Sequence, residues 1–96
     1  TVVIIKNNYL GQIKWEQMIF LGTPEYGVDL QPIDFAAFAH ACGGVGFHLD
    51  RPQKAGSTVE QFLNAPGPAI LEAVVDSNTA PLPGKIKADQ ALKFAE

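Results

Sequence analysis

The sequence has little cysteine and no long hydrophobic run. Cys42 is the single cysteine in 96 residues, so no disulfide can form within the chain, and nothing in its cysteine usage indicates an oxidising compartment. No apolar stretch approaches the ~18 to 20 residues of a membrane span, and Thr1 to Ile5 lacks the basic flank of a signal peptide. We therefore expect a cytoplasmic protein without a membrane-spanning helix.

Positive charge is also scarce. Seven Lys and Arg residues stand against ten Asp and Glu residues, and the net charge is -3, the wrong sign for a protein that follows a phosphate backbone. Nucleic acid is therefore not an expected partner. Apolar residues make up 47% and charged residues 18% of the chain, a balance that excludes disorder and allows one small hydrophobic core.

Strand and helix patterns alternate along the chain, and this order predicts an α/β fold with a parallel sheet. The β-branched run Thr1 to Ile5 is typical of a central strand covered on both faces. Because three strands make a thin sheet, we expect the chain to be part of a larger doubly wound domain. The predicted strands are 1–5, 45–49 and 69–75. Four helices are predicted: one at about 11–20, one capped by Asp34 and stopped at Gly43 and Gly44, one opened by a Ser57 and Glu60 capping box, and one at about 89–95. Residues 21–32 are predicted to form a surface loop and residues 77–84 an extended tail.

Two asparagines follow the first predicted strand. In an open α/β sheet, ligands bind at the carboxyl ends of the strands, and Asn7-Asn8-Tyr9 occupies the first such end. An Asn side-chain oxygen and a backbone carbonyl two residues later are hard oxygen donors of the kind that Mg²⁺ takes beside phosphate oxygens. An ordinary Asn-Asn turn explains the same residues. Their spacing does not decide between the two hypotheses.

A longer pattern carries a family resemblance. The run from Lys6 to Gln17, followed by Pro24-Glu25-Tyr26-Gly27, Asp34-Phe35-Ala36 and Ala41-Cys42-Gly43-Gly44, resembles the C-terminal cofactor-binding domain of thiamine-diphosphate enzymes. Pyruvate oxidase, also called pyruvate dehydrogenase (quinone), is the most similar branch, and the acetolactate synthase type comes next. The resemblance covers residues 1 to about 94. It implies that residues 1–96 are the C-terminal part of a thiamine-diphosphate-binding domain, with an extended tail from about residue 77.

The same resemblance assigns roles to individual residues. The family's metal motif opens with Gly-Asp-Gly, which this chain lacks, and closes with Asn. Aligning on Leu10-Gly11 makes Asn7 the Mg²⁺ ligand and the Tyr9 carbonyl the second ligand, whereas Asn8 is the competing choice. Leu10, Gly11 and Ile13 are then cofactor-binding residues, with Ile13 near the thiazolium.

Glu16 faces the bound substrate in this family, and the resemblance therefore makes it the catalytic candidate. The alternative from the residues alone is that Glu16 is a solvated charge on a helix whose packing stripe is Trp15, Met18 and Ile19. Cys42 and His40 lie two positions apart on one helix, which turns them about 200° from each other and excludes a nucleophile and base pair. We expect Cys42 to be buried, His40 to be solvated and His48 to lack a ligand partner nearby in sequence.

By resemblance, the whole enzyme decarboxylates a 2-oxo acid such as pyruvate by an oxidative route that uses thiamine diphosphate and Mg²⁺, and FAD in the full protein is left open. The family forms homo-oligomers, dimers or tetramers, whose partner subunit supplies a Glu that activates the cofactor. Membrane contact is left open too. The alternatives are acetolactate synthase-type carboligation and a stand-alone, non-catalytic flavodoxin-like module. Since the upstream Asp and the partner's Glu lie outside these residues, we expect the fragment alone to be inactive.

Overall fold

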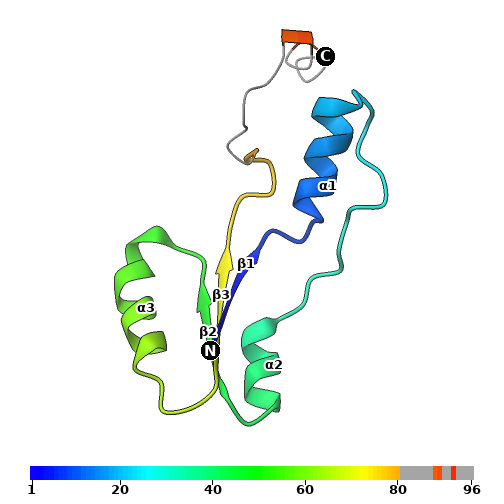
Figure 1. Cartoon of the computed structure of the whole chain (residues 1–96). Helices are drawn as coiled ribbons and strands as arrows, with labels where there is room; N and C mark the ends of the chain where they lie inside the picture. The colour runs from blue at the N-terminus through cyan, green and yellow to red at the C-terminus, as the bar shows by residue number, and fades with distance from the viewer. Residues whose placement is uncertain (81–87, 90–91, 93–96) are drawn as a thin grey trace. The chain divides into compact units, whose positions relative to one another are not determined.

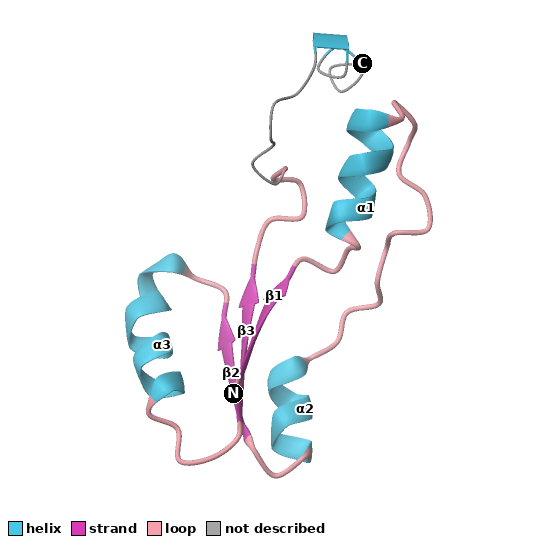
Figure 2. Cartoon of the chain, viewed as in Figure 1, coloured by secondary structure: helices cyan, strands magenta, loops and turns pink. Residues whose placement is uncertain are grey.

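The computed structural model describes residues 1–80, 88–89 and 92, and it confirms the predicted α/β class with a parallel sheet (Figures 1 and 2). The described residues form two compact units. The first comprises Thr1–Asn7 and Pro32–Val75, and the second comprises Asn8–Gln31 and the chain from Asp76. The elements in chain order are β1 (Val2–Lys6), α1 (Gly11–Trp15), the π-helix η1 (Glu16–Phe20), α2 (Phe35–Ala41), β2 (Val45–Leu49), the 3₁₀ helix η2 (Pro52–Lys54), α3 (Ala55–Leu63) and β3 (Ala69–Val74).

The sheet of the first unit has the order β1-β3-β2, and both strand pairs are parallel. In the described sheet β3 occupies the middle and β1 an edge, so the central position of the first strand within a larger doubly wound domain stays a prediction. Val2, Val3 and Ile5 of β1 are more than half exposed, although their β-branched composition is that of a covered strand. The β-branched composition favours a strand, but it does not fix the position of that strand in the sheet.

Successive residues of β3 face opposite sides of the sheet, as strand geometry requires. Leu71 and Ala69 pack with Phe62 of α3, and the Phe62 ring meets the Phe47 ring edge-on at 6.0 Å between centroids. On the other side, the carboxylate of Glu72 accepts a hydrogen bond from the first backbone N–H of α2, at Phe35. Figure 1 shows α2 and α3 on either side of the three strands. The small apolar core lies under α3.

The helix α2 confirms its predicted cap, because the Asp34 side chain accepts a hydrogen bond from the Ala37 N–H at 2.9 Å. Gly43 follows the helix with φ 81°, a conformation that favours glycine. Gly46 in β2 is needed for another reason, since a Cβ built there would overlap the backbone of Ala36. The helix thus lies directly on the glycine backbone.

Cys42 is exposed, which corrects the prediction that it is buried: it follows α2 as the cap residue.

The helix α3 begins at Ala55, earlier than the Ser57 and Glu60 capping box predicts. The 3₁₀ turn η2, with Pro52 at its first position, leads directly into α3. The Ser57 hydroxyl donates to the Lys54 carbonyl, so this side chain bonds to the preceding turn and does not cap a helix. The capping-box pattern therefore indicated the helix correctly but misplaced its start.

In the second unit, the predicted helix at 11–20 is present, and its second half is a π-helix that the sequence did not indicate. The Leu21 N–H donates to the Glu16 carbonyl, five residues earlier, at 3.2 Å. Trp15 and Ile19 of the predicted packing stripe are buried and Met18 is partly buried. The loop after the helix is exposed apart from Val28. The Gln17 side chain links this loop to the helix, because it accepts a hydrogen bond from the Tyr26 N–H and donates one to the Tyr26 carbonyl.

The chain after β3 opens with a turn where an extended tail was predicted. Asp76 accepts hydrogen bonds from the Asn78 N–H and the Thr79 hydroxyl. These bonds lower the pKa of the Asp76 carboxyl. Residues 81–87 of the tail, and most of the helix predicted at 89–95, lie outside the described residues. Among the residues that the structure describes, no helix is both long and apolar enough to cross a membrane.

Candidate functional site

The turn Asn8–Leu10 is held by a short antiparallel pairing with the end of the following loop. Tyr9 forms a bridge with Asp29, the Leu10 N–H donates to the Val28 carbonyl at 2.9 Å, and the Leu30 N–H donates to the Asn8 carbonyl at 2.9 Å. Asn8 has φ 60°, a left-handed conformation that Asn tolerates better than most residues. Val28 is only 1% exposed, which anchors the pairing.

This pairing orients the peptide group that joins Tyr9 to Leu10. A trans peptide bond is planar and directs its C=O and N–H to opposite sides. Since the Leu10 N–H donates to Val28, the Tyr9 carbonyl of the same peptide group points away from Val28. The carbonyl predicted as a metal ligand therefore has a fixed direction before any ligand binds.

The helix α1 begins directly after the turn, and an open concavity lies at its start. Tyr9, Leu10, Gly11, Gln12, Ile13 and Glu16 line this concavity. Glu16 is exposed and accepts a hydrogen bond from the Gln12 side chain at 3.2 Å. Leu10 and Ile13 are also exposed, although they are apolar. The concavity thus combines apolar side chains with one carboxylate.

Lys14 lies behind this surface and is only 3% exposed. Its ammonium donates to the Ser77 carbonyl at 3.2 Å and the Asn78 side chain at 3.4 Å, and it forms an ion pair with Glu25 at 3.6 Å. The same ammonium lies 4.3 Å from the centroid of the Tyr9 ring. A buried lysine needs such partners, because an unpaired buried charge is strongly unfavourable.

The Tyr9 phenol has a second charged neighbour. The Asp29 carboxylate raises the pKa of Tyr9 through its negative charge and through a hydrogen bond with the phenol. Both effects favour the protonated phenol. The Tyr9 side chain is therefore held between an ammonium at its ring and a carboxylate at its hydroxyl.

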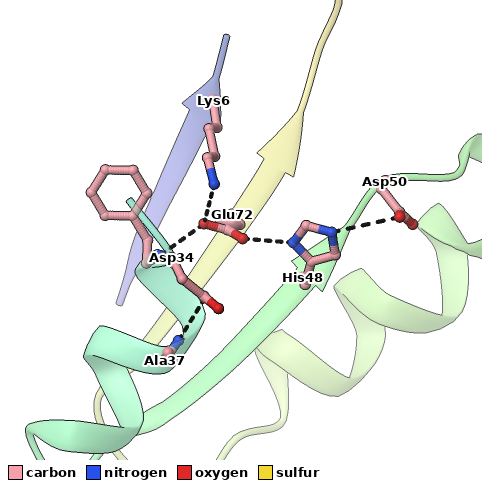
Figure 3. Close-up of polar contacts among 7 residues, drawn as sticks. Lys6, Asp34, Ala37, His48, Asp50 and Glu72 are labelled. Carbon is pink, nitrogen blue, oxygen red and sulfur yellow. Dashed lines mark hydrogen bonds and ion pairs between the residues drawn. The ribbon is translucent and has the colours of Figure 1, made fainter. Parts of the chain in front are cut away.

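A second polar cluster lies in the first unit around Glu72, which is 1% exposed in the middle of β3 (Figure 3). His48 donates from Nδ1 to the Glu72 carboxylate at 2.6 Å, and Lys6 approaches it at 3.5 Å. Burial alone raises the pKa of Glu72, but the hydrogen bonds from His48 and the Phe35 N–H, with the charge of Lys6, bring the pKa below its ordinary value of 4.5. The cluster keeps a buried carboxylate ionised.

The structure brings together five of the six predicted site residues around the concavity: Tyr9, Leu10, Gly11, Ile13 and Glu16. Asn7 follows β1 at the carboxyl end of the sheet and belongs to the first unit. Within residues 1–80, 88–89 and 92, no three His, Cys, Asp or Glu side chains form a group that could hold a metal ion. The Asn7 amide and the Tyr9 carbonyl stay the predicted ligands, and neutral oxygens of this kind suit Mg²⁺ as part of a ligand set.

Sequence interpretation missed two charged clusters. Lys14 belonged to a helix interpreted only through its apolar stripe, and its burial depends on Glu25 and on the 77–78 turn, which are distant in sequence. His48 was expected to lack a metal-ligand partner nearby in sequence; its contacts are to Glu72, 24 residues away, and, through Nε2, to Asp50 at 3.6 Å. The one available signal was Glu72 itself, a charge within an apolar strand.

Comparison with known proteins decides the family. The model of the thiamine pyrophosphate enzyme C-terminal TPP-binding domain matches residues 1–73. The chain belongs to this family. The match covers β1, the turn, α1 and nearly all of β3, so the concavity lies inside the TPP-binding domain. Thiamine pyrophosphate and thiamine diphosphate are two names for the same cofactor.

Two of three similar relatives are named acetolactate synthases, and the name of the third states its cofactor but no activity. The thiamine pyrophosphate-containing protein YdaP of Bacillus subtilis (strain 168) is 35% identical over 96 residues, all of this chain and 16% of YdaP. Acetolactate synthase 2, chloroplastic, of Zea mays is 28% identical over 91 residues, 85% of this chain and 14% of the relative. The catabolic acetolactate synthase of Raoultella terrigena is 32% identical over 56 residues, 58% of this chain and 10% of the relative. The chain thus spans at most about a sixth of the length of these relatives.

Proposed function

We propose that the full-length protein is a thiamine diphosphate- and Mg²⁺-dependent enzyme that decarboxylates a 2-oxo acid such as pyruvate and passes the electrons to an oxidant. The observation that carries this proposal is the fixed turn Asn8–Leu10 leading directly into α1, with Glu16 on the concavity beside it. FAD as the internal oxidant and a homo-oligomeric assembly belong to the same proposal, by resemblance to the pyruvate oxidase branch.

In this proposal, Asn7 and the Tyr9 carbonyl hold Mg²⁺ against the diphosphate. The orientation of the Tyr9 carbonyl away from Val28 supports its assignment. The left-handed φ of Asn8 gives that residue a conformational role of its own, which favours Asn7 as the ligand. The remaining metal ligand is a carboxylate from outside these residues, since a Mg²⁺ diphosphate site commonly includes one or two carboxylates.

When bound, thiamine diphosphate supplies the carbon nucleophile and the electron sink for loss of CO₂. The chain's own residues provide binding and environment. Leu10 and Ile13 give the concavity an apolar surface on which the cofactor can pack, and Glu16 places a carboxylate beside it for proton transfer with the substrate. Gln12 orients that carboxylate through its hydrogen bond.

The test measures CO₂ release from pyruvate by the full-length protein with thiamine diphosphate, Mg²⁺ and an artificial electron acceptor. Glu16→Gln should lower kcat and kcat/KM together by at least about a hundredfold, the lower range for general acid-base catalysis, while the apparent cofactor affinity changes little. Glu60→Gln, an exposed charge on α3, is the matched control and should leave both constants unchanged. If the Glu16 variant and the wild type turn over pyruvate equally fast, Glu16 is a solvated charge on the helix and has no catalytic role.

Carboligation is the second candidate, because two of the relatives are named acetolactate synthases. The same assay separates the two activities when pyruvate is supplied without an electron acceptor. Accumulation of acetolactate under these conditions would favour the carboligase. Turnover only with the acceptor supports the oxidative proposal. If the protein shows neither activity and does not bind thiamine diphosphate, the result would support the non-catalytic module.

A further inference from the structure

Lys14 connects the proposed metal-binding turn to two other parts of the second unit. Its backbone N–H donates to the Leu10 carbonyl at 2.9 Å, and its ammonium lies against the Tyr9 ring. The ammonium also reaches Glu25 in the loop and Ser77 and Asn78 in the turn after β3. A side chain that is 3% exposed cannot itself serve as a surface binding group for substrate.

The position of Tyr9 depends on these contacts. The backbone pairing with residues 28–30 fixes the peptide group after Tyr9, while the ammonium and Asp29 hold the two ends of its side chain. A cation over an aromatic ring is attracted to the ring, more strongly where water is excluded, and the Lys14 ammonium is buried. The Tyr9 ring thus links the Lys14 charge to the residue whose carbonyl is proposed to bind Mg²⁺.

We propose that Lys14 is a positioning residue of the cofactor site: through the Tyr9 ring it holds the turn Asn8–Leu10 in its binding geometry before Mg²⁺ and the diphosphate arrive. This inference rests on the proposed function. Lys14 touches neither metal nor cofactor and acts through Tyr9. Its removal therefore weakens cofactor binding and leaves turnover at saturating cofactor nearly unchanged.

The experiment is calorimetric titration of the full-length apo-protein with thiamine diphosphate at fixed Mg²⁺. Lys14→Met, which keeps the length of the side chain and removes the charge, should raise the Kd about tenfold, by analogy with the lower range for groups that orient metal ligands. Tyr9→Leu removes the ring and keeps the backbone carbonyl, so it should raise the Kd by a similar factor. Tyr9→Phe keeps the ring beneath the ammonium and should bind within about threefold of the wild type.

The double variant distinguishes positioning through Tyr9 from general structural support. If Lys14 acts through the ring, Lys14→Met in the Tyr9→Leu background should add less than about twofold, because the contact is already absent. A further tenfold loss in that background would overturn the proposal, as would an unchanged Kd in Lys14→Met. A fall in kcat at saturating cofactor with unchanged Kd would also contradict it.

Two outcomes need separate controls. If Lys14→Met does not fold, the comparison of Tyr9→Leu with Tyr9→Phe tests the inference on its own. Equal Kd values for thiamine diphosphate in these two variants would overturn it. Asn7→Ala separates the inference from the proposed function. If Asn7→Ala weakens cofactor binding and Lys14→Met does not change it, only the positioning role of Lys14 is contradicted. If the wild-type protein does not bind thiamine diphosphate, both the positioning role and the proposed function are contradicted.

Discussion

Glu72 is a carboxylate in the middle of a buried strand, where an apolar residue would be expected. It is held by three donors from three different elements: Lys6 at the end of β1, His48 in β2 and the first N–H of α2. A buried carboxylate with so many donors is strongly coupled to the fold, because loss of its charge leaves Lys6 without its counter-charge and weakens the hydrogen bonds from His48 and the Phe35 N–H. Glu72 thus joins the strands to α2.

This coupling makes stability depend on pH. The folded-state pKa of Glu72 lies below its ordinary value of 4.5, so its ionised form stabilises the fold fully above about pH 4.5 and progressively less as pH falls through the folded-state pKa. Glu72→Gln should lower the free energy of unfolding at pH 7 by about 1 to 3 kcal/mol. The difference from the wild type should narrow as the pH falls below about 4.5.

Hydrogen exchange of the β3 amides in the full-length protein, measured across this pH range, provides the local readout. Asp50→Asn is the matched control, since Asp50 is half exposed and contacts only the outer nitrogen of His48, and its effect should stay within ~0.5 kcal/mol. If the difference in the free energy of unfolding between Glu72→Gln and the wild type does not vary with pH, the pKa of Glu72 is not lowered in the folded state and this explanation is wrong.

At the scale of elements, local patterns predicted the three strands and the α-helices, but they predicted neither the π-helix η1 and the 3₁₀ helix η2 nor how the elements pack. The Asp34 cap and the glycines after α2 are local signals, and both predictions were confirmed. The start of α3, the exposure of Cys42 and the π-helix after Trp15 depend on tertiary context that a short sequence window does not contain. The turn at Asn8 was predicted as a turn, whereas its pairing with 28–30 joins residues twenty positions apart.

The contact between α2 and β2 yields a prediction at this scale. Gly46→Ala places a methyl group against the Ala36 backbone, which cannot move without displacing the helix, so it should destabilise the protein by about 1 to 3 kcal/mol. Gly56→Ala in α3 meets no atom within 4 Å and should be neutral or stabilise by up to ~1 kcal/mol. Thermal unfolding of the two variants measures the difference. Equal melting temperatures would contradict the close packing.

At the scale of the whole molecule, the sequence resemblance and the family match agree on a TPP-binding domain, while the substrate stays a proposal. Glu16 and the residues from Tyr9 to Ile13 could be grouped from the sequence because they are neighbours on one turn and one helix. The second proposed ligand is a backbone carbonyl, whose direction follows from hydrogen bonds and not from residue identity. Asn7 and Asn8 stayed alternatives for a different reason: they are identical amides at adjacent positions, and the choice depended on the alignment at Leu10-Gly11.

The most direct test of the account is the affinity of the full-length apo-protein for thiamine diphosphate at fixed Mg²⁺, compared between two asparagine variants. Asn7→Ala removes the proposed side-chain ligand and should raise the Kd more than tenfold, since a Mg²⁺ shell has few protein oxygens. Asn8→Gly removes the neighbouring amide but permits the same left-handed backbone, so it should bind within about threefold of the wild type. A large loss in Asn8→Gly with unchanged affinity in Asn7→Ala would contradict the assignment and make Asn8 the ligand.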